Sequence, residues 1–356
     1  MYKVSVIIPM YNVEEFLKYA IESLKKQTIG FENLEILLID DCSTDGTSKI
    51  ANDFSNKYKN VIYYKMPQNS GMAGKPRNVG MTLATSKYIM FLDPDDLYLP
   101  NACKIMYDTI EAKNLNIVTA NFKWVDINGN DLNRIQIDRN KYSSQYLSIS
   151  KPEESLQILT NACWTKIVNR EFILHNDIRF LEGVPAEDAY FTYNIFLKEK
   201  SIYYLDEVIV DYRVRDAGNV SETNNLTLRY FNRIIQANRE IFLLFNKFSE
   251  LVYYKYYYID YFVYIVRKVI LSNQTNLDEK VEALINMKDL LENFEKFGFS
   301  RDVENDEFNF LEIFEITNTE EMETFVEKFM KIFKDMGMDE VRRKEKLIIT
   351  DLKKQI

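Results

Sequence analysis

The first 120 residues alternate between short apolar runs and stretches in which apolar residues recur every three or four positions. The run Val4–Ile8 suits a buried strand, whereas the apolar positions from Val13 to Leu24 follow the period of an amphipathic helix. Strands that alternate with helices predict βαβ units, and therefore a parallel sheet with helices on both faces. The expected strands are Val4–Ile8, Leu34–Ile39, Val61–Lys65 and Tyr88–Leu92; further helices are expected over Thr47–Tyr58 and, after the loop Asn69–Arg77, to about Ala84.

The pattern is looser in the next hundred residues. We expect a strand at Ile117–Phe122 and a turn at Asp126–Gly129, followed by a polar segment, Asn130–Ser150, that we interpret as a mobile flap. A helix over Ala186–Lys198 and an extended segment over Ile202–Tyr212 complete this part of the chain.

Helical patterns continue from about Asp216 to the end of the chain, where glycine and proline nearly disappear. This change predicts a domain boundary near 216–226, with one domain at 1–216 and an all-helical one at 217–356. Eight tyrosines and phenylalanines crowd Leu251–Tyr264, which favours a core or inter-domain helix over an aromatic surface for sugar polymers, membranes or a partner protomer. The helices expected here are Thr227–Phe248, Leu251–Ser272, Asp278–Phe297, Thr319–Met336 and Asp339–Lys353.

Composition narrows the functional class. The net charge of −9 argues against a general nucleic-acid-binding protein, which needs clustered basic residues. Three widely spaced cysteines indicate reduced thiols and a cytoplasmic protein, and we expect neither a signal peptide nor a transmembrane helix. Because His175 is the only histidine, any metal must be held mainly by carboxylates.

The densest group of candidate ligands is Phe91–Asp96 (FLDPDD), with three aspartates in four positions after a buried strand. Such a group is electrostatically costly unless a cation neutralises it, and oxygen ligands suit Mg²⁺ or Mn²⁺ shared with substrate phosphates. A solvated acidic turn that caps the next helix explains the same pattern equally well.

Three further clusters follow predicted strands or open predicted helices. Asp40–Thr47 (DDCSTDGT) fits both ligand binding and ordinary turn chemistry. Asn69–Asn78 (NSGMAGKPRN) offers two glycines, Lys75 and Arg77 to an anionic ligand, although it is also compatible with a simple loop before a helix. Glu187 and Asp188 open a helix, where the helix dipole alone favours acids.

Together these motifs resemble family 2 glycosyltransferases in order and spacing over about residues 3–215. The likeness rests on Val4–Asn12 (VSVIIPMYN), Ile39–Thr47, Asn69–Gly80, Tyr88–Asp96 and Glu187–Asp188. It implies an α/β GT-A fold, Rossmann-like with a mostly parallel sheet and flanking helices. A nucleotide-sugar half at about 1–97 and an acceptor half at about 98–216 would precede a C-terminal all-α domain. The glycine-rich motif and the added helices are most similar to bacterial transferases that decorate teichoic acids or capsules.

The resemblance also implies a nucleotide site. Pro9 and Tyr11 would line the base pocket. Asp41 would accept a hydrogen bond from uracil N3–H, with Asp40 in support. Asn69 and Arg77 would contact the nucleotide or its diphosphate, and Arg213 resembles a basic position that faces phosphate.

On the reactive side, the resemblance makes Asp93 and Asp95 a DxD pair, with Asp93 near the ribose and Asp95 on Mn²⁺ or Mg²⁺. Asp96 would assist or bind the sugar, and Glu187 would neighbour it. Asp188 would be the general base that deprotonates an acceptor hydroxyl, so that the sugar is transferred from its UDP donor with inversion in one displacement.

The implied acceptor is a hydroxyl of a cell-surface glycan or polyol-phosphate polymer, and the implied location is the cytoplasm, at the inner face of the membrane. Peripheral membrane association and a homo-oligomer through the C-terminal helices are further hypotheses. Two other readings of the carboxylates stay open: a metal-dependent nucleotidyltransferase, which would release pyrophosphate, and a non-catalytic nucleotide-sugar-binding or scaffold protein.

Overall fold

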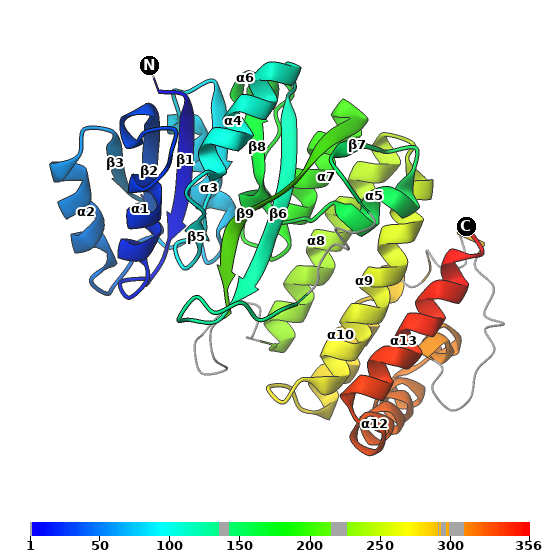
Figure 1. The fold of residues 1–356 in the computed structure, drawn as a ribbon. Helices are drawn as coiled ribbons and strands as arrows, with labels where there is room; N and C mark the ends of the chain where they lie inside the picture. The colour runs from blue at the N-terminus through cyan, green and yellow to red at the C-terminus, as the bar shows by residue number, and fades with distance from the viewer. Residues whose placement is uncertain (1, 135–141, 215–225, 291, 293–296, 299–309) are drawn as a thin grey trace. The chain divides into compact units, whose positions relative to one another are not determined.

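In the computed structural model of the chain, the described residues are 2–134, 142–214, 226–290, 292, 297–298 and 310–356. The chain separates into two compact units, residues 1–219 and 220–356, and each is described by itself. Figure 1 traces both along the chain. The boundary expected near 216–226 falls almost entirely outside the described residues and stays a prediction.

The N-terminal unit is built on one nine-stranded sheet, in the order β3-β2-β1-β4-β8-β6-β9-β5, with β7 paired to β9. Its first four strands are parallel, as the βαβ pattern predicts. Every residue of β1 and β2 is buried, which explains their nearly continuous apolar sequence. The bounds of these four strands are β1 Val4–Met10, β2 Leu34–Asp40, β3 Val61–Lys65 and β4 Tyr88–Phe91.

The rest of the sheet is mixed. β6 and β9 are parallel, whereas β8 runs antiparallel to β4 and to β6, and both β5 and β7 run antiparallel to β9. Part of the expected flap is therefore a strand, because residues 145–148 form β7; residues 135–141 of that flap lie outside the described residues. The remaining strands are β5 Leu97–Tyr98, β6 Ile117–Val125, β7 Gln145–Ser148, β8 Lys166–Asn169 and β9 Ser201–Arg213.

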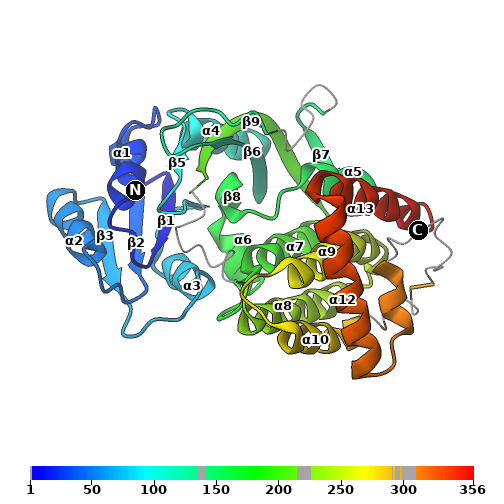
Figure 2. The ribbon, with the colours of Figure 1, turned by 90° about the horizontal axis from the view of Figure 1, so that it is seen from below.

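Helices cover both faces of this sheet. Figure 2 shows α1 and α4 on one face and α3 and α7 on the other. The sequence pattern predicted α1, α2, α3 and α7 but not α4. The bounds are α1 Leu17–Lys25, α2 Thr47–Lys57, α3 Gly74–Leu83, α4 Ala102–Lys113, α5 Pro152–Ile158, α6 Arg170–His175 and α7 Glu187–Glu199, with short 3₁₀ turns at Phe31–Asn33 (η1) and Cys163–Thr165 (η2).

The C-terminal unit is helical, as predicted. Its long helix α9 buries Tyr253, Tyr254, Tyr258 and Tyr261, so the tyrosine-rich stretch is a core element of this unit. The expected helix Asp278–Phe297 is interrupted: α10 ends at Ile285, and residues 288–290 and 292 are again helical, while residues 291 and 293–296 are not described. The elements are α8 Leu228–Lys247, α9 Leu251–Leu271, α10 Leu277–Ile285, η4 Phe310–Glu315, α12 Thr319–Met336 and α13 Met338–Lys353.

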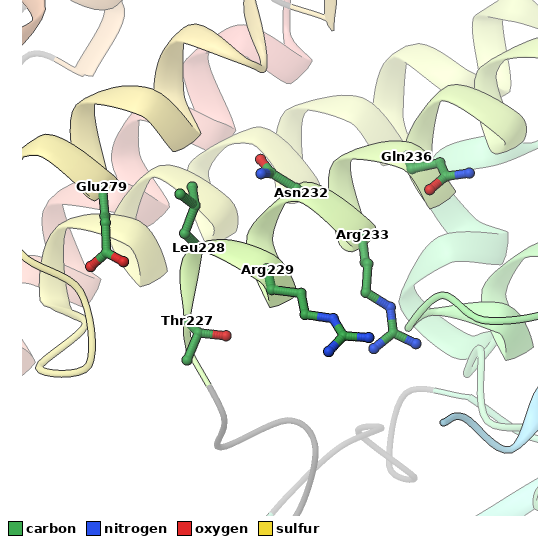
Figure 3. Close-up of a pocket in the computed structure, with 7 residues that line it drawn as sticks. All are labelled: Thr227, Leu228, Arg229, Asn232, Arg233, Gln236 and Glu279. Carbon is green, nitrogen blue, oxygen red and sulfur yellow. The ribbon is translucent and has the colours of Figure 1, made fainter. Parts of the chain in front are cut away.

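A pocket of about 860 Å³ lies beside the first turns of α8. Figure 3 shows Arg229 and Arg233 extending toward the same side of this helix. The Glu279 carboxylate at its rim accepts the Asn276 N–H and so belongs to the capping box of α10. Across the described part of both units, no helix has the length and apolar character needed to cross a bilayer.

Candidate functional site

The candidate site lies at the carboxyl ends of β1, β2 and β4. Because these strands are parallel and adjacent, the residues that follow them meet at one edge of the sheet. Tyr11 follows β1, Asp41 follows β2 and Asp93 follows β4 after one intervening residue. Three motifs that are far apart in the sequence are therefore brought together.

The β1 end carries a buried proline and an exposed aromatic ring. Pro9 lies within the buried strand, whereas Tyr11 keeps 49% of its surface exposed. The next residue, Asn12, has a φ of 50°, and its backbone N–H donates to Ser43 Oγ at 3.1 Å. This contact joins the loops after β1 and β2. Tyr11 is thus exposed at the strand end, and its role in lining a base pocket stays a prediction.

Asp40 is a structural anchor. Its buried carboxylate accepts hydrogen bonds from Ser43 N–H at 2.7 Å, Ser48 Oγ at 2.5 Å and Tyr63 Oη at 2.9 Å. Burial alone would raise its pKa, but these hydrogen bonds outweigh burial and hold the pKa below its ordinary value. Asp40 therefore fixes the turn from which Asp41 projects.

Asp41 joins that turn to the glycine-rich loop. Its carboxylate accepts from Ser70 N–H at 2.8 Å, Ser70 Oγ at 2.9 Å and Asn69 Nδ2 at 3.2 Å. Burial raises the pKa of Asp41, which these hydrogen bonds oppose. Asn69, an exposed residue, thus lies beside Asp41, and their shared role in a nucleotide site stays a prediction. Sequence analysis missed Ser70, whose only signal was its place in the small polar loop.

Arg77 forms a buried bridge between two carboxylates. Its Nη2 lies 2.8 Å from Asp93 Oδ1 and its Nη1 lies 2.7 Å from Glu187 Oε1. The guanidinium also packs over the Phe180 ring, and its buried Nε has no partner among the described residues. Arg77, which lies on α3, therefore joins this helix both to the loop that follows β4 and to the start of α7. Its predicted contact with a diphosphate stays a prediction, and in this structure both Nη atoms are engaged by protein carboxylates.

Gly74 allows this bridge to form. A Cβ added to Gly74 would lie 2.0 Å from the backbone oxygen of Leu181. Only glycine lets the start of α3 approach the segment before α7 so closely.

The remaining acids of the DxD loop differ in exposure. Asp95 is half-buried, whereas Asp96 is buried and accepts the Arg213 backbone N–H at 2.9 Å. Arg213 Nε also donates to the backbone oxygen of Asp95. Burial and the nearby negative charges of Asp95 and Asp93 raise the pKa of Asp96 well above its ordinary value. The buried Oδ2 atom of Asp96 has no hydrogen-bond partner within the described residues. Arg213 thus holds the shape of this loop.

The pair Glu187–Asp188 opens α7 after a strained residue. Ala186 adopts a φ of 61°, which is unfavourable for a residue with a Cβ and is a feature that clusters at functional sites. Burial and the adjacent Asp188 raise the pKa of Glu187 to about 7, although Arg77 opposes this. Asp188 is half-buried, and its side chain makes no hydrogen bond or ion pair with any described residue. It is therefore available to a substrate.

The strand-end acids do not by themselves form a complete site for a divalent cation. Within the residues that the structure describes, no group of three or more histidine, cysteine or acidic side chains is placed to hold a metal ion. Mg²⁺ and related ions are commonly held by one or two carboxylates together with substrate phosphates. Asp95 and Asp93 offer such a partial, oxygen-only set at the strand ends.

Comparison with known proteins agrees with this geometry. Residues 5–174 match the family model described as Glycosyl transferase family 2. The chain is 36% identical over 236 residues to the minor teichoic acid biosynthesis protein GgaB of Bacillus subtilis. The aligned region covers 65% of this chain and 25% of GgaB. It is 30% identical over 222 residues to the poly(ribitol-phosphate) beta-N-acetylglucosaminyltransferase TarS of Staphylococcus aureus, over 61% of this chain and 36% of TarS.

A third relative is the cholesterol galactosyltransferase of Borreliella burgdorferi, 26% identical over 314 residues, or 83% of this chain and 85% of that protein. The chain thus spans well under half the length of GgaB and TarS but most of this relative.

The crystal structure of S. aureus TarS residues 1–349 in complex with UDP-GlcNAc superimposes with a TM-score of 0.54. The match has 22% identity and covers 83% of this chain and 73% of that one. The shared fold is GT-A, as predicted. With the motifs assembled at the strand ends and the matching family model, residues 5–174 of this chain form a glycosyl transferase family 2 domain, and its relatives include teichoic acid glycosyltransferases.

Proposed function

We propose that the chain is an inverting, divalent-metal-dependent glycosyltransferase that moves a hexose or N-acetylhexosamine from a UDP-sugar to a hydroxyl of a polyol-phosphate or related cell-surface polymer. One observation carries the proposal: Arg77 joins Asp93 of the DxD pair to Glu187, and the available carboxylate of the next residue, Asp188, lies close enough to act on the same Arg77 charge. The relatives' names support the acceptor class.

Each part of the site then has a role. Tyr11 stacks on the base, and Asp41 with Asn69 recognises its edge. Asp95 and Asp93 hold a Mn²⁺ or Mg²⁺ ion, which when bound neutralises charge on the departing diphosphate. Asp188 takes the proton of the acceptor hydroxyl as that oxygen attacks the anomeric carbon from the face opposite the leaving group. Direct displacement needs no covalent nucleophile. The buried Cys163 does not suit that role, since burial raises the pKa of its thiol well above the ordinary value.

The test is release of UDP from UDP-glucose, UDP-galactose, UDP-GlcNAc and UDP-GalNAc, with Mn²⁺, first without acceptor and then with poly(ribitol phosphate). We expect one donor to be turned over, with loss of activity in EDTA and in Asp95→Ala. Pyrophosphate release in place of UDP would favour a nucleotidyltransferase. Binding of UDP without turnover of any donor would favour a non-catalytic protein.

A second candidate acceptor is a sterol hydroxyl. It is favoured by the match to the cholesterol galactosyltransferase, which extends over 85% of that relative. Cholesterol in detergent, offered with each donor in the same assay, separates it from the polymer. The cytoplasmic location, membrane association and oligomeric state stay predictions.

A further inference from the structure

Each unit contains a buried lysine. Lys166 lies on β8 in the N-terminal unit and is fully buried; Lys280 lies on α10 in the C-terminal unit and is 2% exposed. Lysine is almost never fully buried in proteins unless its ammonium group is satisfied. The partners of these two residues therefore show what each buried charge does.

Lys166 fixes a short piece of backbone. Its Nζ donates to the backbone oxygen of Thr160 at 2.7 Å and to that of Ala162 at 2.8 Å. The backbone oxygen between them, that of Asn161, accepts from Thr192 Oγ1 at 3.0 Å. Three successive carbonyl groups, which we call the carbonyl segment Thr160–Ala162, are thus held by Lys166 and Thr192, and Thr165 Oγ1 also donates to the Ala162 oxygen at 2.9 Å.

The second of these side chains belongs to the helix of the proposed base. Thr192 lies four residues beyond Asp188 on α7, so the two share one helix face. The carbonyl segment is therefore attached to the face that carries Asp188. Lys166 also interacts electrostatically with Asp188. Burial lowers the pKa of Lys166 to about 7, whereas the charges of Cys163 and Asp188 act to raise it.

We propose that Lys166 is a positioning residue of the transfer site: it anchors the carbonyl segment, which through Thr192 holds the first turns of α7, and with them Asp188, in the reactive position. The inference rests on the proposed role of Asp188. A buried ammonium is costly, and a role that an apolar side chain cannot perform explains its presence.

Lys280 provides a matched control. Its Nζ also donates to two backbone oxygens, those of Val269 and Ser272, and to a threonine hydroxyl, that of Thr275. Burial lowers its pKa as well. Lys280→Met therefore removes a buried ammonium with the same kind of partners, none of which belongs to the candidate site.

The kinetic test compares Lys166→Met, Thr192→Val and Lys280→Met, well below the melting temperature of each. We expect the first two to lower kcat by about 10-fold to 10²-fold, because displacement of a reacting group by about 1 Å has that scale. UDP affinity should stay within about twofold, and Lys280→Met should retain kcat. Because Lys166 and Thr192 act through the same carbonyl segment, the variant that carries both substitutions should have a kcat only slightly below that of the more affected single variant. Equal losses in Lys166→Met and Lys280→Met would overturn the proposal.

A second measurement does not depend on activity. Amide hydrogen exchange over residues 187–193 should rise in Lys166→Met and Thr192→Val but not in Lys280→Met. Unchanged exchange in both would overturn the positioning role, and if Lys166→Met fails to fold, Thr192→Val decides. Raised exchange in a protein that transfers no sugar would reject the proposed function and leave only the structural link from Lys166 to α7, so the two failures are distinguishable.

Discussion

Replacing Arg77 with methionine tests whether this residue is chiefly a structural bridge or a ligand for phosphate. The substitution keeps an unbranched side chain and removes the charge shared by Asp93 and Glu187. The Arg77 and Glu187 side chains are 4% and 9% exposed, so this pair is buried, whereas Asp93 is 26% exposed and is better screened by water. Loss of one partner from a buried pair costs about 3–5 kcal/mol. We expect about 3 kcal/mol here, most of it from Glu187.

The cost should depend on pH. In the folded wild type the pKa of Glu187 is raised to about 7 from an ordinary value of 4.5, so the folded state retains a proton that the unfolded state releases in this interval. Stability therefore falls as the pH rises from 4.5 to about 7. Without Arg77 this pKa rises further, and the fall continues to higher pH. At about pH 5.5 Glu187 is mostly protonated in both the wild type and Arg77→Met. The two proteins should therefore differ less in their free energy of unfolding at this pH than at about pH 8.5.

Urea unfolding of wild type and Arg77→Met at both pH values measures this difference. Arg179→Met is the control in the same unit, because Arg179 makes an exposed pair with Asp177 that should be worth less than about 1 kcal/mol. Equal costs for the two variants, or a cost that does not change with pH, would refute the bridge. Weaker UDP binding with unchanged stability would instead support the phosphate contact.

Three further predictions concern single positions. Asp188→Asn should lower turnover by about 10²–10⁴-fold with little change in UDP affinity, measured by UDP release and calorimetry; near-normal turnover would remove Asp188 from the role of base. Tyr11→Ala should weaken UDP binding by about 1–3 kcal/mol while Tyr11→Phe retains it, since stacking needs only the ring; equal affinities in titrations of all three proteins would exclude stacking. Gly74→Ala should lower the free energy of unfolding by about 1–3 kcal/mol, since its Cβ would meet the Leu181 oxygen; thermal unfolding at wild-type temperature would contradict that crowding.

Sequence patterns predicted the N-terminal half of the sheet well because each element there satisfies a local rule. The strand expected at Val61–Lys65 is β3 without a change of bounds. The helix α4 was missed because its buried positions, Ala102, Cys103, Met106 and Ile110, form a narrow stripe among polar residues. β5 has only two residues, and in β8 only Ile167 and Val168 are apolar, so neither strand gives a clear apolar run.

The site residues were found as separate clusters, but their contacts could not be read from the sequence. The bridge between Arg77 and Glu187 joins positions 110 residues apart. Lys166 carries no motif, because backbone oxygens such as those of Thr160 and Ala162 give no sequence signal, and the link from the same segment to Thr192 spans 31 residues.

The contacts of Asp41 have a consequence for its proposed role in recognising the base. Its oxygens already accept from Ser70 and Asn69, so a base that donates to them exchanges one set of hydrogen bonds for another. Such an exchange adds little net affinity. A base that presents only acceptor atoms would instead displace the Ser70 and Asn69 donors and place its lone pair against the Asp41 carboxylate, which is repulsive. This position would then act by rejecting the wrong base rather than by rewarding the right one.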